Sequence, residues 1–484
     1  MPPLKKIKPS TLILFVIIIV AALLRFNALA FQSLWLDELH TAIEANPVLP
    51  WHSLFNYLKC CDQHPPVFFI LERFSFLLFG HNEWAARFVP ALTGIACVWA
   101  IYRLGKELFN EQLGLIAALF TCINYFNIFY AQEARDYELL WLMTTLSYLY
   151  FIRLVKNLRT SDAIWYVILT ALLLYTHYFG LLVLFCQGVL AIIYWLLNKE
   201  TKKKFLITFL IAWLAVAILY IPWLPFFKEI ANIKSFWIER PKPNFFITFF
   251  SEYFGNAKIL KPFLYAFIIF FLLRAFLSRK TFANPQSNPF AFSFIFIVIA
   301  ILFPYAILYL KSITSVPVLI SRYTMEVLPP IIIALSFGVI FIPGKMLRYG
   351  VFGIFICLTL YNLIVTKRYY STISKEQFRE MTNYVVTEKN NVPLINELTA
   401  WQQQYYLDKF HYTGKVFTGK KEDIIDSILH KSSPQYTIDT FWLVGAHNDP
   451  KLTPNKQQAL DTAYNLISQK DYYGAWAQLY ARKK

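Results

Sequence analysis

The sequence predicts an all-α protein that crosses a membrane about eleven times and carries a small α/β domain at its C-terminal end. Hydrophobic residues make up 57% of its 484 residues and charged residues only 15%, whereas soluble domains carry roughly 25% charged residues. The formal net charge of +17 does not indicate a nucleic-acid-binding protein, because most basic residues lie in short clusters between long apolar stretches. Such clusters are typical of cytoplasmic loops.

Apolar stretches of about 20 residues predict the transmembrane helices, because such a helix crosses the hydrocarbon core with its backbone groups paired internally. The first stretch follows Lys5, Lys6 and Lys8. It is interpreted as an uncleaved helix, because no small-residue cleavage site follows it. The predicted spans are 11–30, 85–103, 112–130, 138–153, 162–178, 181–198, 205–225, 261–278, 290–310, 323–342 and 348–366.

Basic residues follow every even-numbered predicted span. Because cytoplasmic loops are enriched in Lys and Arg, this pattern places the N-terminus and these loops in the cytoplasm. The loop at about 226–260 also contains several lysines and is an exception. The clusters are Arg103 and Lys106; Arg153, Lys156 and Arg159; Lys199 and Lys202 to Lys204; Arg274, Arg279 and Lys280; and Lys345 and Arg348.

The predicted topology depends on whether residues 65–79 cross the membrane. The stretch is short, opens with two prolines, and has Glu72 and Arg73 in its middle. Counting it as a span would put every later basic cluster outside. We therefore predict an amphipathic helix along the outer membrane surface, within a large first outer loop at 31–84.

The composition changes after residue 366. The predicted domains are therefore a membrane domain at 1–366 and a polar domain at 367–484, which the odd number of spans places outside the cytoplasm. Residues 440–444 predict a buried strand. Pro454 begins a predicted helix that continues over 456–468.

Polar residues with catalytic potential nearly all fall on the predicted outer side. Ionisable groups at the membrane boundary are costly to bury, so they are candidates for a functional site. The candidates are Asp37 and Glu38 in the first outer loop, His64 in the 64–66 HPP motif, Glu133 and Arg135 in the 132–137 QEARDY motif, His177 in the third outer turn, and Arg322 and Tyr323 at the start of the tenth span.

The order of these motifs resembles the GT-C glycosyltransferases over about residues 10–370. A carboxylate pair, then HPP, then the AARF motif at 85–88 is similar to the family 39 group, which includes protein O-mannosyltransferases and lipid A aminoarabinose transferases. A QEAR-x-Y second loop and an Arg-Tyr pair opening a late span are typical of its bacterial branch. The C-terminal domain carries no part of this resemblance.

The resemblance implies a polyprenyl-phosphate-linked sugar as donor, at the outer face of the inner membrane. The acceptor is left open among a protein Ser or Thr, a lipid A phosphate and a glycan hydroxyl. It implies Asp37 as general base with Glu38 beside it. Arg135, Arg322 and Tyr323 would bind the departing phosphate, and His64 would add a donor. Glu133 would orient Arg135, contact the sugar or help bind a divalent cation, and the need for a metal is left open.

Each motif also has a purely structural interpretation. The WLDE stretch at 35–38 fits an interfacial anchor, HPP fits a turn, and Arg322 fits a side chain that extends to lipid headgroups. Asp136 is interpreted as a solvated or capping residue. The alternative function is a transporter or flippase of lipid-linked sugars. Such a protein would place ionisable residues near the bilayer midplane, where this sequence has few.

Overall fold

The computed structural model describes residues 8–62, 64–197, 202–231, 234–235, 237–277, 289–447 and 449–484. Contacts divide the chain into two compact units. The first comprises Met1–Asn27, Leu49–Leu71 and Arg87–Tyr369, and the second comprises Ala28–Val48, Glu72–Ala86 and Tyr370–Lys484. Two parts of the predicted outer loop 31–84 therefore belong to the second unit.

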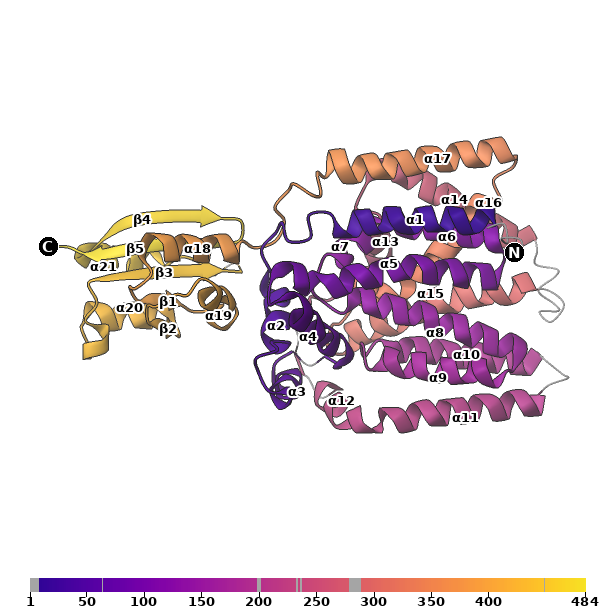
Figure 1. The fold of residues 1–484 in the computed structure, drawn as a ribbon, viewed down its shortest axis with the longest axis horizontal. Coiled ribbons are helices and arrows are strands. Elements are labelled where there is room, and N and C mark those ends of the chain that lie inside the picture. Colours follow the sequence, from indigo (N-terminus) through magenta and orange to yellow (C-terminus); the bar gives the residue numbers. More distant parts are fainter. Residues whose placement is uncertain are drawn as a thin grey trace, which may run out of the picture. The chain divides into compact units, whose positions relative to one another are not determined.

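The first unit is a bundle of long helices that run side by side (Figure 1). Its helices are α1 (Pro9–Phe26), α3 (Trp51–Cys60), α5 (Glu83–Leu108), α6 (Glu111–Ile123), α7 (Tyr125–Ala131), α8 (Tyr137–Asn157), α9 (Thr160–Leu174), α10 (Gly180–Leu197), α11 (Lys202–Tyr220), η1 (Ile221–Trp223), α12 (Leu224–Ala231), α13 (Phe245–Tyr253), η2 (Lys258–Leu260), α14 (Lys261–Leu277), α15 (Pro289–Thr314), η4 (Ser321–Val327), α16 (Leu328–Ile340), α17 (Lys345–Tyr361) and η5 (Asn362–Thr366). The helix α4 (Val67–Phe79) and α5 each have residues in both units.

Each of the eleven predicted spans corresponds to helical structure in the bundle. In the described part of the chain, nine helices are long and apolar enough to cross a membrane. Helices α6 and α7 together are also long and apolar enough, with a bend of 59° between them, which makes ten if the pair is one span. The eleventh, α9, is apolar but has only 15 residues, about 22 Å of helix. Residues 65–79 form α4, whose 13 residues are too few to cross the membrane as a helix.

The bend between α6 and α7 is stabilised by polar side chains. Asn124 lies at the break, and its side chain accepts a hydrogen bond from the backbone N–H of Asn127 at 2.9 Å. The buried guanidinium of Arg25 donates to the carbonyl oxygens of Thr121 and Cys122 at 3.0 and 3.1 Å. These carbonyls lie at the end of α6, where no further turn pairs with them. These hydrogen bonds stabilise the bend between α6 and α7.

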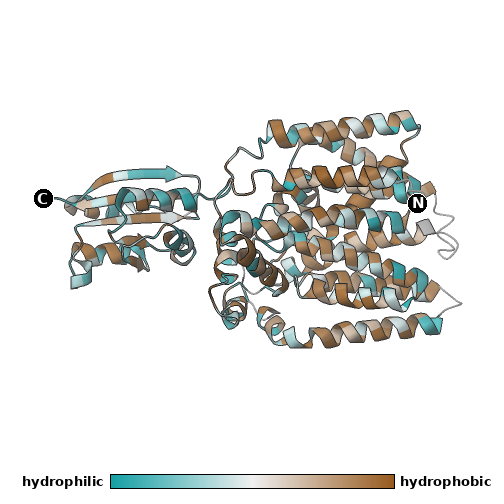
Figure 2. Cartoon of the chain, in the orientation of Figure 1, coloured by the Kyte–Doolittle hydropathy of each residue, from teal (hydrophilic) through white to brown (hydrophobic). Residues whose placement is uncertain are grey.

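Helix α16 lies in the core of the bundle, and its residues are buried from Leu328 to Val339. It packs against α6, α14 and α15. The approach to α14 requires glycine at 338, because a Cβ there would lie 1.8 Å from the carbonyl oxygen of Phe267. Peripheral helices such as α11 and α17 expose large apolar side chains instead, as expected for surfaces that face lipid (Figure 2).

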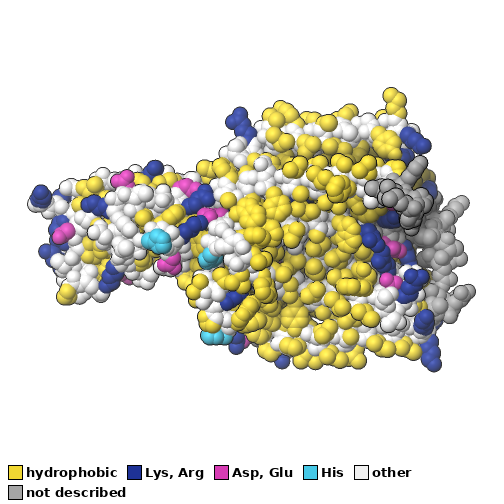
Figure 3. All heavy atoms as spheres, in the orientation of Figure 1, with side chains coloured by type: hydrophobic (Ala, Val, Ile, Leu, Met, Phe, Trp, Pro, Cys, Tyr) yellow, Lys and Arg dark blue, Asp and Glu magenta, His cyan; other side chains and the backbone are white. Residues whose placement is uncertain are grey.

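Charge is unevenly distributed over the bundle. Lys and Arg side chains gather at the end where α1 begins, while the visible sides are covered by hydrophobic side chains (Figure 3). The alternating direction of the helices brings the ends of α5, α8 and α10 to the same end as the start of α1 (Figure 1). The loops at 132–136 and 175–179 lie at the opposite end.

The second unit contains a five-stranded sheet with the order β2-β1-β3-β5-β4. Strands β1 and β2, and β1 and β3, are parallel, while β3 and β5, and β5 and β4, are antiparallel. The unit comprises α2 (Leu36–Glu44), α18 (Phe378–Lys389), β1 (Leu394–Asn396), α19 (Ala400–Lys409), β2 (Val416–Thr418), α20 (Lys421–Leu429), η6 (Pro434–Tyr436), β3 (Thr440–Ala446), α21 (Pro454–Ala463), β4 (Tyr464–Tyr472) and β5 (Ala475–Arg482).

The predicted strand at 440–444 is confirmed as β3, whereas the helix predicted over 456–468 is wrong in its second half. The helix ends at Ala463, and β4 begins at Tyr464. The exposed positions of β4 include both polar residues and the adjacent pair Leu466 and Ile467, so the sequence lacks the alternating pattern of a strand there. Antiparallel pairing with the buried β5, through a turn in which Gly474 adopts φ +67°, determines the strand instead.

Candidate functional site

Four segments of the first unit meet at the end of the bundle away from the start of α1. They are the stretch before α4, the loop between α7 and α8, the turn between α9 and α10, and the start of η4. These segments carry six of the candidate residues that the sequence predicts: His64, Glu133, Arg135, His177, Arg322 and Tyr323.

The loop between α7 and α8 is anchored to the end of α1. The side-chain amide of Gln132 donates to the backbone oxygens of Arg25 and Asn27 at 2.9 and 2.7 Å. The N–H of Arg135 then donates to the backbone oxygen of Glu133 at 2.7 Å, closing a tight turn. Glu133 is buried in this turn. The turn directs the guanidinium of Arg135 toward the stretch before α4.

Arg135 forms a bidentate ion pair with Asp62, a residue that the sequence analysis missed. Its Nη1 and Nη2 lie 2.8 and 3.1 Å from the two carboxylate oxygens of Asp62. Nη2 also lies 3.3 Å from both ring nitrogens of His64. The His64 Nδ1 lies 2.7 Å from the backbone oxygen of Asp62 and 3.2 Å from its Oδ1. Asp62 therefore orients both a guanidinium and an imidazole.

The charges of this group shift the pKa values of its members in opposite directions. Burial opposes the charged form of Asp62, but the nearby Arg135 and His64 outweigh it and hold the pKa of that carboxyl well below its usual range. Burial would also lower the pKa of His64. Asp62 more than compensates, so the net pKa of His64 is raised. The ion pair is thus maintained at neutral pH.

Arg322 and Tyr323 lie in an aromatic environment. The guanidinium carbon of Arg322 is 5.3 Å from the ring centroid of Trp237, 5.7 Å from that of Tyr323 and 5.9 Å from that of Tyr137. The Tyr323 ring lies 5.9 Å from that of His177. Stacking on aromatic faces fixes the plane of a guanidinium. This chain of rings connects Arg322 to the histidines of the site.

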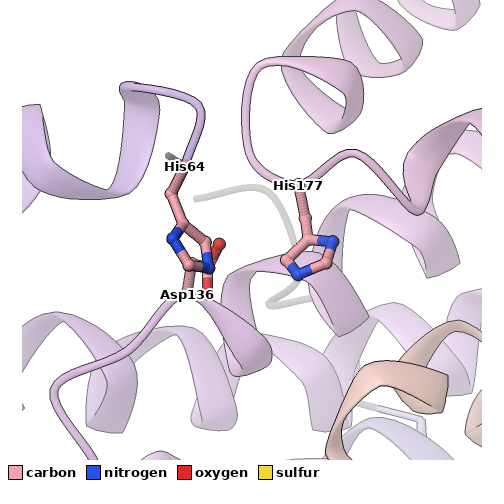
Figure 4. A group of neighbouring side chains, drawn as sticks. All are labelled: His64, Asp136 and His177. Atoms are coloured by element: carbon pink, nitrogen blue, oxygen red, sulfur yellow. The ribbon is translucent and has the colours of Figure 1, made fainter. Parts of the chain in front are cut away.

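His64, Asp136 and His177 converge from three different segments (Figure 4). One potential ligand atom from each lies within 4.8 Å of those of the other two, so the group could hold a metal ion. The expectation that Asp136 is solvated or caps a helix is wrong: its side chain is 1% exposed and makes no capping hydrogen bond to α8. Burial lowers the pKa of His177 to about 4, so this imidazole is neutral at physiological pH.

An apolar cavity of about 440 Å³ lies beside this polar cluster. Pro66, two residues after His64, and Tyr175, two residues before His177, contribute to its wall. The other lining residues are Phe55, Val67, Ile70, Pro222, Trp223 and Phe226. The cavity has the chemistry of a binding site for a hydrocarbon chain.

The predicted carboxylate pair belongs to the second unit, in the first turn of α2. Asp37 is half-buried. The carboxylate of Glu38 is fully buried, accepts a hydrogen bond from the backbone N–H of Trp35 at 3.4 Å, and forms an ion pair with Lys375 at 3.0 Å. The two neighbours therefore differ in access to solvent. Lys375 is a second residue that the sequence analysis missed.

Polar contacts bind the α2 segment to the C-terminal part of the same unit. The side chain of Gln32 accepts hydrogen bonds from the N–H groups of Ser374 and Lys375, both at 2.8 Å. The hydroxyl of Tyr406 accepts one from the N–H of Leu34 at 2.9 Å. Glu83 pairs with Lys409 at 2.5 Å and with Arg379 at 3.5 Å. The C-terminal domain thus fixes the position of the acidic segment.

Comparison with known proteins identifies the fold. The family model described as dolichyl-phosphate-mannose-protein mannosyltransferase matches residues 63–226. The structure is similar to ArnT from Cupriavidus metallidurans in the apo state, with a TM-score of 0.64 and 11% identity over 98% of each chain. ArnT bound to undecaprenyl phosphate gives a TM-score of 0.56 and 12% identity over 97% of each chain.

The archaeal oligosaccharyltransferase AglB from Archaeoglobus fulgidus, in complex with an inhibitory peptide and a dolichol-phosphate, gives a TM-score of 0.57 and 11% identity. That match covers 98% of this chain and 74% of AglB. Comparison with curated proteins finds no match. The chain therefore has the GT-C glycosyltransferase fold, a multi-span membrane fold, as the order of its motifs predicts.

Proposed function

We propose that this protein, which has the GT-C fold, transfers a sugar from a polyprenyl-phosphate carrier to an acceptor hydroxyl at the outer face of the membrane. The observation that carries the proposal is the meeting of Arg135, Arg322 and His64 beside an apolar cavity. Guanidinium and imidazole groups suit a phosphate, and the cavity suits the first isoprene units of the carrier. ArnT bound to undecaprenyl phosphate and AglB in complex with a dolichol-phosphate hold lipid phosphates of this class.

Arg322 is the principal phosphate ligand in this proposal. The guanidinium of Arg135 is already paired with Asp62 through both terminal nitrogens, so it contributes mainly positive potential and a fixed position for His64. The guanidinium of Arg322 lies between aromatic rings that fix its plane. A planar group in a fixed position suits bidentate binding of phosphate oxygens.

The reaction is a single in-line displacement. The acceptor oxygen attacks the anomeric carbon, the bond from that carbon to the phosphate oxygen breaks, and the polyprenyl phosphate leaves with the electron pair. The acceptor proton passes to the carboxylate of Asp37 as general base. Displacement from the face opposite the phosphate inverts the anomeric configuration.

Asp37 suits the base role better than Glu38. The carboxylate of Glu38 is buried and held by Lys375 and by the N–H of Trp35, whereas Asp37 in the same turn keeps partial access to solvent. We therefore assign Asp37 to proton transfer and Glu38 to the position of α2. Glu133 is assigned to the shape of the loop that presents Arg135.

The charge distribution supports a cytoplasmic location for the end of the bundle where α1 begins, because Lys and Arg gather there (Figure 3). The site would then open to the extracytoplasmic side of the inner membrane, and the C-terminal domain would lie on that side. A donor carried by a lipid phosphate fits this location, since nucleotide sugars are made in the cytoplasm.

A transfer assay tests the proposal. Purified full-length protein in lipid nanodiscs is incubated with a panel of synthetic polyprenyl-phosphate sugars, and release of polyprenyl phosphate is followed by mass spectrometry. We expect turnover of at least one donor and a loss of 10²-fold or more in Asp37→Asn, which removes the general base. The matched control is Asp162→Asn, an aspartate in the first turn of α9 at the other end of the bundle.

Two outcomes would contradict the proposal. Full turnover by Asp37→Asn would remove this residue from proton transfer. Movement of a fluorescent lipid-linked sugar between the leaflets of proteoliposomes, without consumption of any donor, would favour the flippase alternative.

A further inference from the structure

We propose that His64, Asp136 and His177 bind a transition-metal ion of the zinc class, through two imidazole nitrogens and one carboxylate oxygen. The potential ligand atoms all lie within 4.8 Å of one another (Figure 4). Two ligands of a tetrahedral zinc ion, each about 2.1 Å from the metal, lie about 3.4 Å apart. The ligand atoms must therefore approach one another by about 1.4 Å at most to close around an ion.

The carboxylate of Asp136 provides the second, independent observation. It is 1% exposed, and within the described residues neither of its oxygens has a hydrogen-bond partner. A buried carboxylate without a partner costs several kcal/mol. The adjacent guanidinium of Arg135 is directed to Asp62 instead. A bound cation would compensate for this burial.

The surroundings of His64 match those of a metal ligand. Its Nδ1 lies 2.7 Å from the backbone oxygen of Asp62, so the ring proton is donated there. Nε2 is then the nitrogen that offers a lone pair to an ion, and an ion would replace its 3.3 Å contact with Nη2 of Arg135. Histidines that bind metals commonly donate their other ring N–H to a carbonyl or carboxylate in this way. The negative charge of Asp62 also balances the positive charge of Arg135. The negative charge of Asp136 is therefore the one that remains to attract a cation.

His177 must adjust to take part. Its Nδ1 accepts a hydrogen bond from the N–H of Phe179 at 3.1 Å. Coordination through Nε2 places the ring proton on Nδ1, so the contact with Phe179 opens when the ion binds. Two imidazoles and one carboxylate favour Zn²⁺ over Mg²⁺ or Ca²⁺, which prefer oxygen ligands. Three protein ligands leave a fourth position for water or a substrate oxygen.

Metal content tests this site without any sugar donor, so the result does not depend on the proposed function. Full-length protein is stripped with a chelator, reloaded with ZnCl₂, freed of unbound ion and analysed by plasma mass spectrometry. We expect one equivalent of zinc in the wild type and in the control Asp162→Asn. We expect at least tenfold weaker binding in Asp136→Asn and His177→Gln, and 10- to 100-fold weaker binding in Asp62→Asn, which loses the group that orients His64.

Cobalt gives a readout that does not depend on folding of the variants. Wild-type protein loaded with Co²⁺ should show visible absorption of a low-coordinate Co²⁺ ion, and Zn²⁺ should abolish that absorption. Wild-type protein that retains no zinc, or Asp136→Asn protein that retains a full equivalent, would overturn the proposal. A site that binds only millimolar Mg²⁺ would overturn the assignment to nitrogen ligands.

Discussion

Replacing Lys375 with methionine should release helix α2 from the C-terminal domain. Lys375 and Glu38 form an ion pair at 3.0 Å, with 7% and 0% of their side chains exposed. Methionine retains most of the apolar stem and removes the charge. Glu38 is then a buried carboxylate that no longer pairs with Lys375. Removing one partner of a buried pair costs about 3 to 5 kcal/mol.

Protonation limits that cost. At pH 7, protonating a glutamate with an ordinary pKa of about 4.3 costs about 3.7 kcal/mol. We therefore expect local opening of α2 to become about 3 to 4 kcal/mol easier.

Amide hydrogen exchange of the full-length protein measures this local opening. A change of 3 to 4 kcal/mol corresponds to exchange about 10² to 10³ times faster in residues 36–44. The control is Lys451→Met, whose pair with Asp471 has side chains 40% and 58% exposed and should contribute less than about 1 kcal/mol. If α2 in Lys375→Met exchanges within threefold of the wild-type rate, the ion pair does not hold this helix.

Three further predictions concern packing, pH and phosphate binding. Gly338→Ala should destabilise the bundle by about 3 kcal/mol or more in thermal unfolding, since the new Cβ would meet a backbone oxygen of α14 at 1.8 Å. Gly350→Ala, inside α17 and with no other described part of the chain within 4 Å of the new Cβ, should be neutral or stabilise the helix by up to about 1 kcal/mol. Equal melting temperatures of the two variants would contradict this account. Burial and the nearby Glu38 raise the pKa of Glu72 well above its usual value, so the stability that is present at low pH is lost as the pH rises through the folded-state pKa. Glu72→Gln should therefore flatten the plot of unfolding free energy against pH above pH 5. An unchanged slope of that plot would show that Glu72 does not cause the loss. Arg322→Lys keeps the positive charge but loses the planar guanidinium that lies among three aromatic rings. The KM for the donor should therefore rise about tenfold or more, while the melting temperature stays unchanged. An unaltered KM would exclude Arg322 from donor binding.

The number and order of the membrane helices could be predicted because long apolar runs are a local property of the sequence. The bend between α6 and α7 could not, since it depends on the guanidinium of Arg25, which reaches the last carbonyls of α6 from another helix. The strand β4 was missed for a similar reason. Its polar residues become a strand by pairing with β5, which pattern analysis of a single segment does not detect.

The candidate site was predicted in part. The motifs identified His64, Arg135, Arg322 and Tyr323 because charged residues beside apolar runs are conspicuous. Asp62 was missed because its role depends on Arg135, 73 positions further along the chain. Its place two residues before His64 was the available signal. The burial of Asp136 had no signal, because an aspartate before a helix usually caps it.

The contacts of Gln32, Leu34 and Glu38 with residues 374 to 406 join an early part of the chain to one that the ribosome makes more than 300 residues later. During synthesis the α2 segment therefore emerges long before its supports exist. A nascent chain can insert its helices while the carboxylates of α2 stay unfixed. Synthesis of the segment up to Tyr406 thus becomes a condition for assembling the acidic segment.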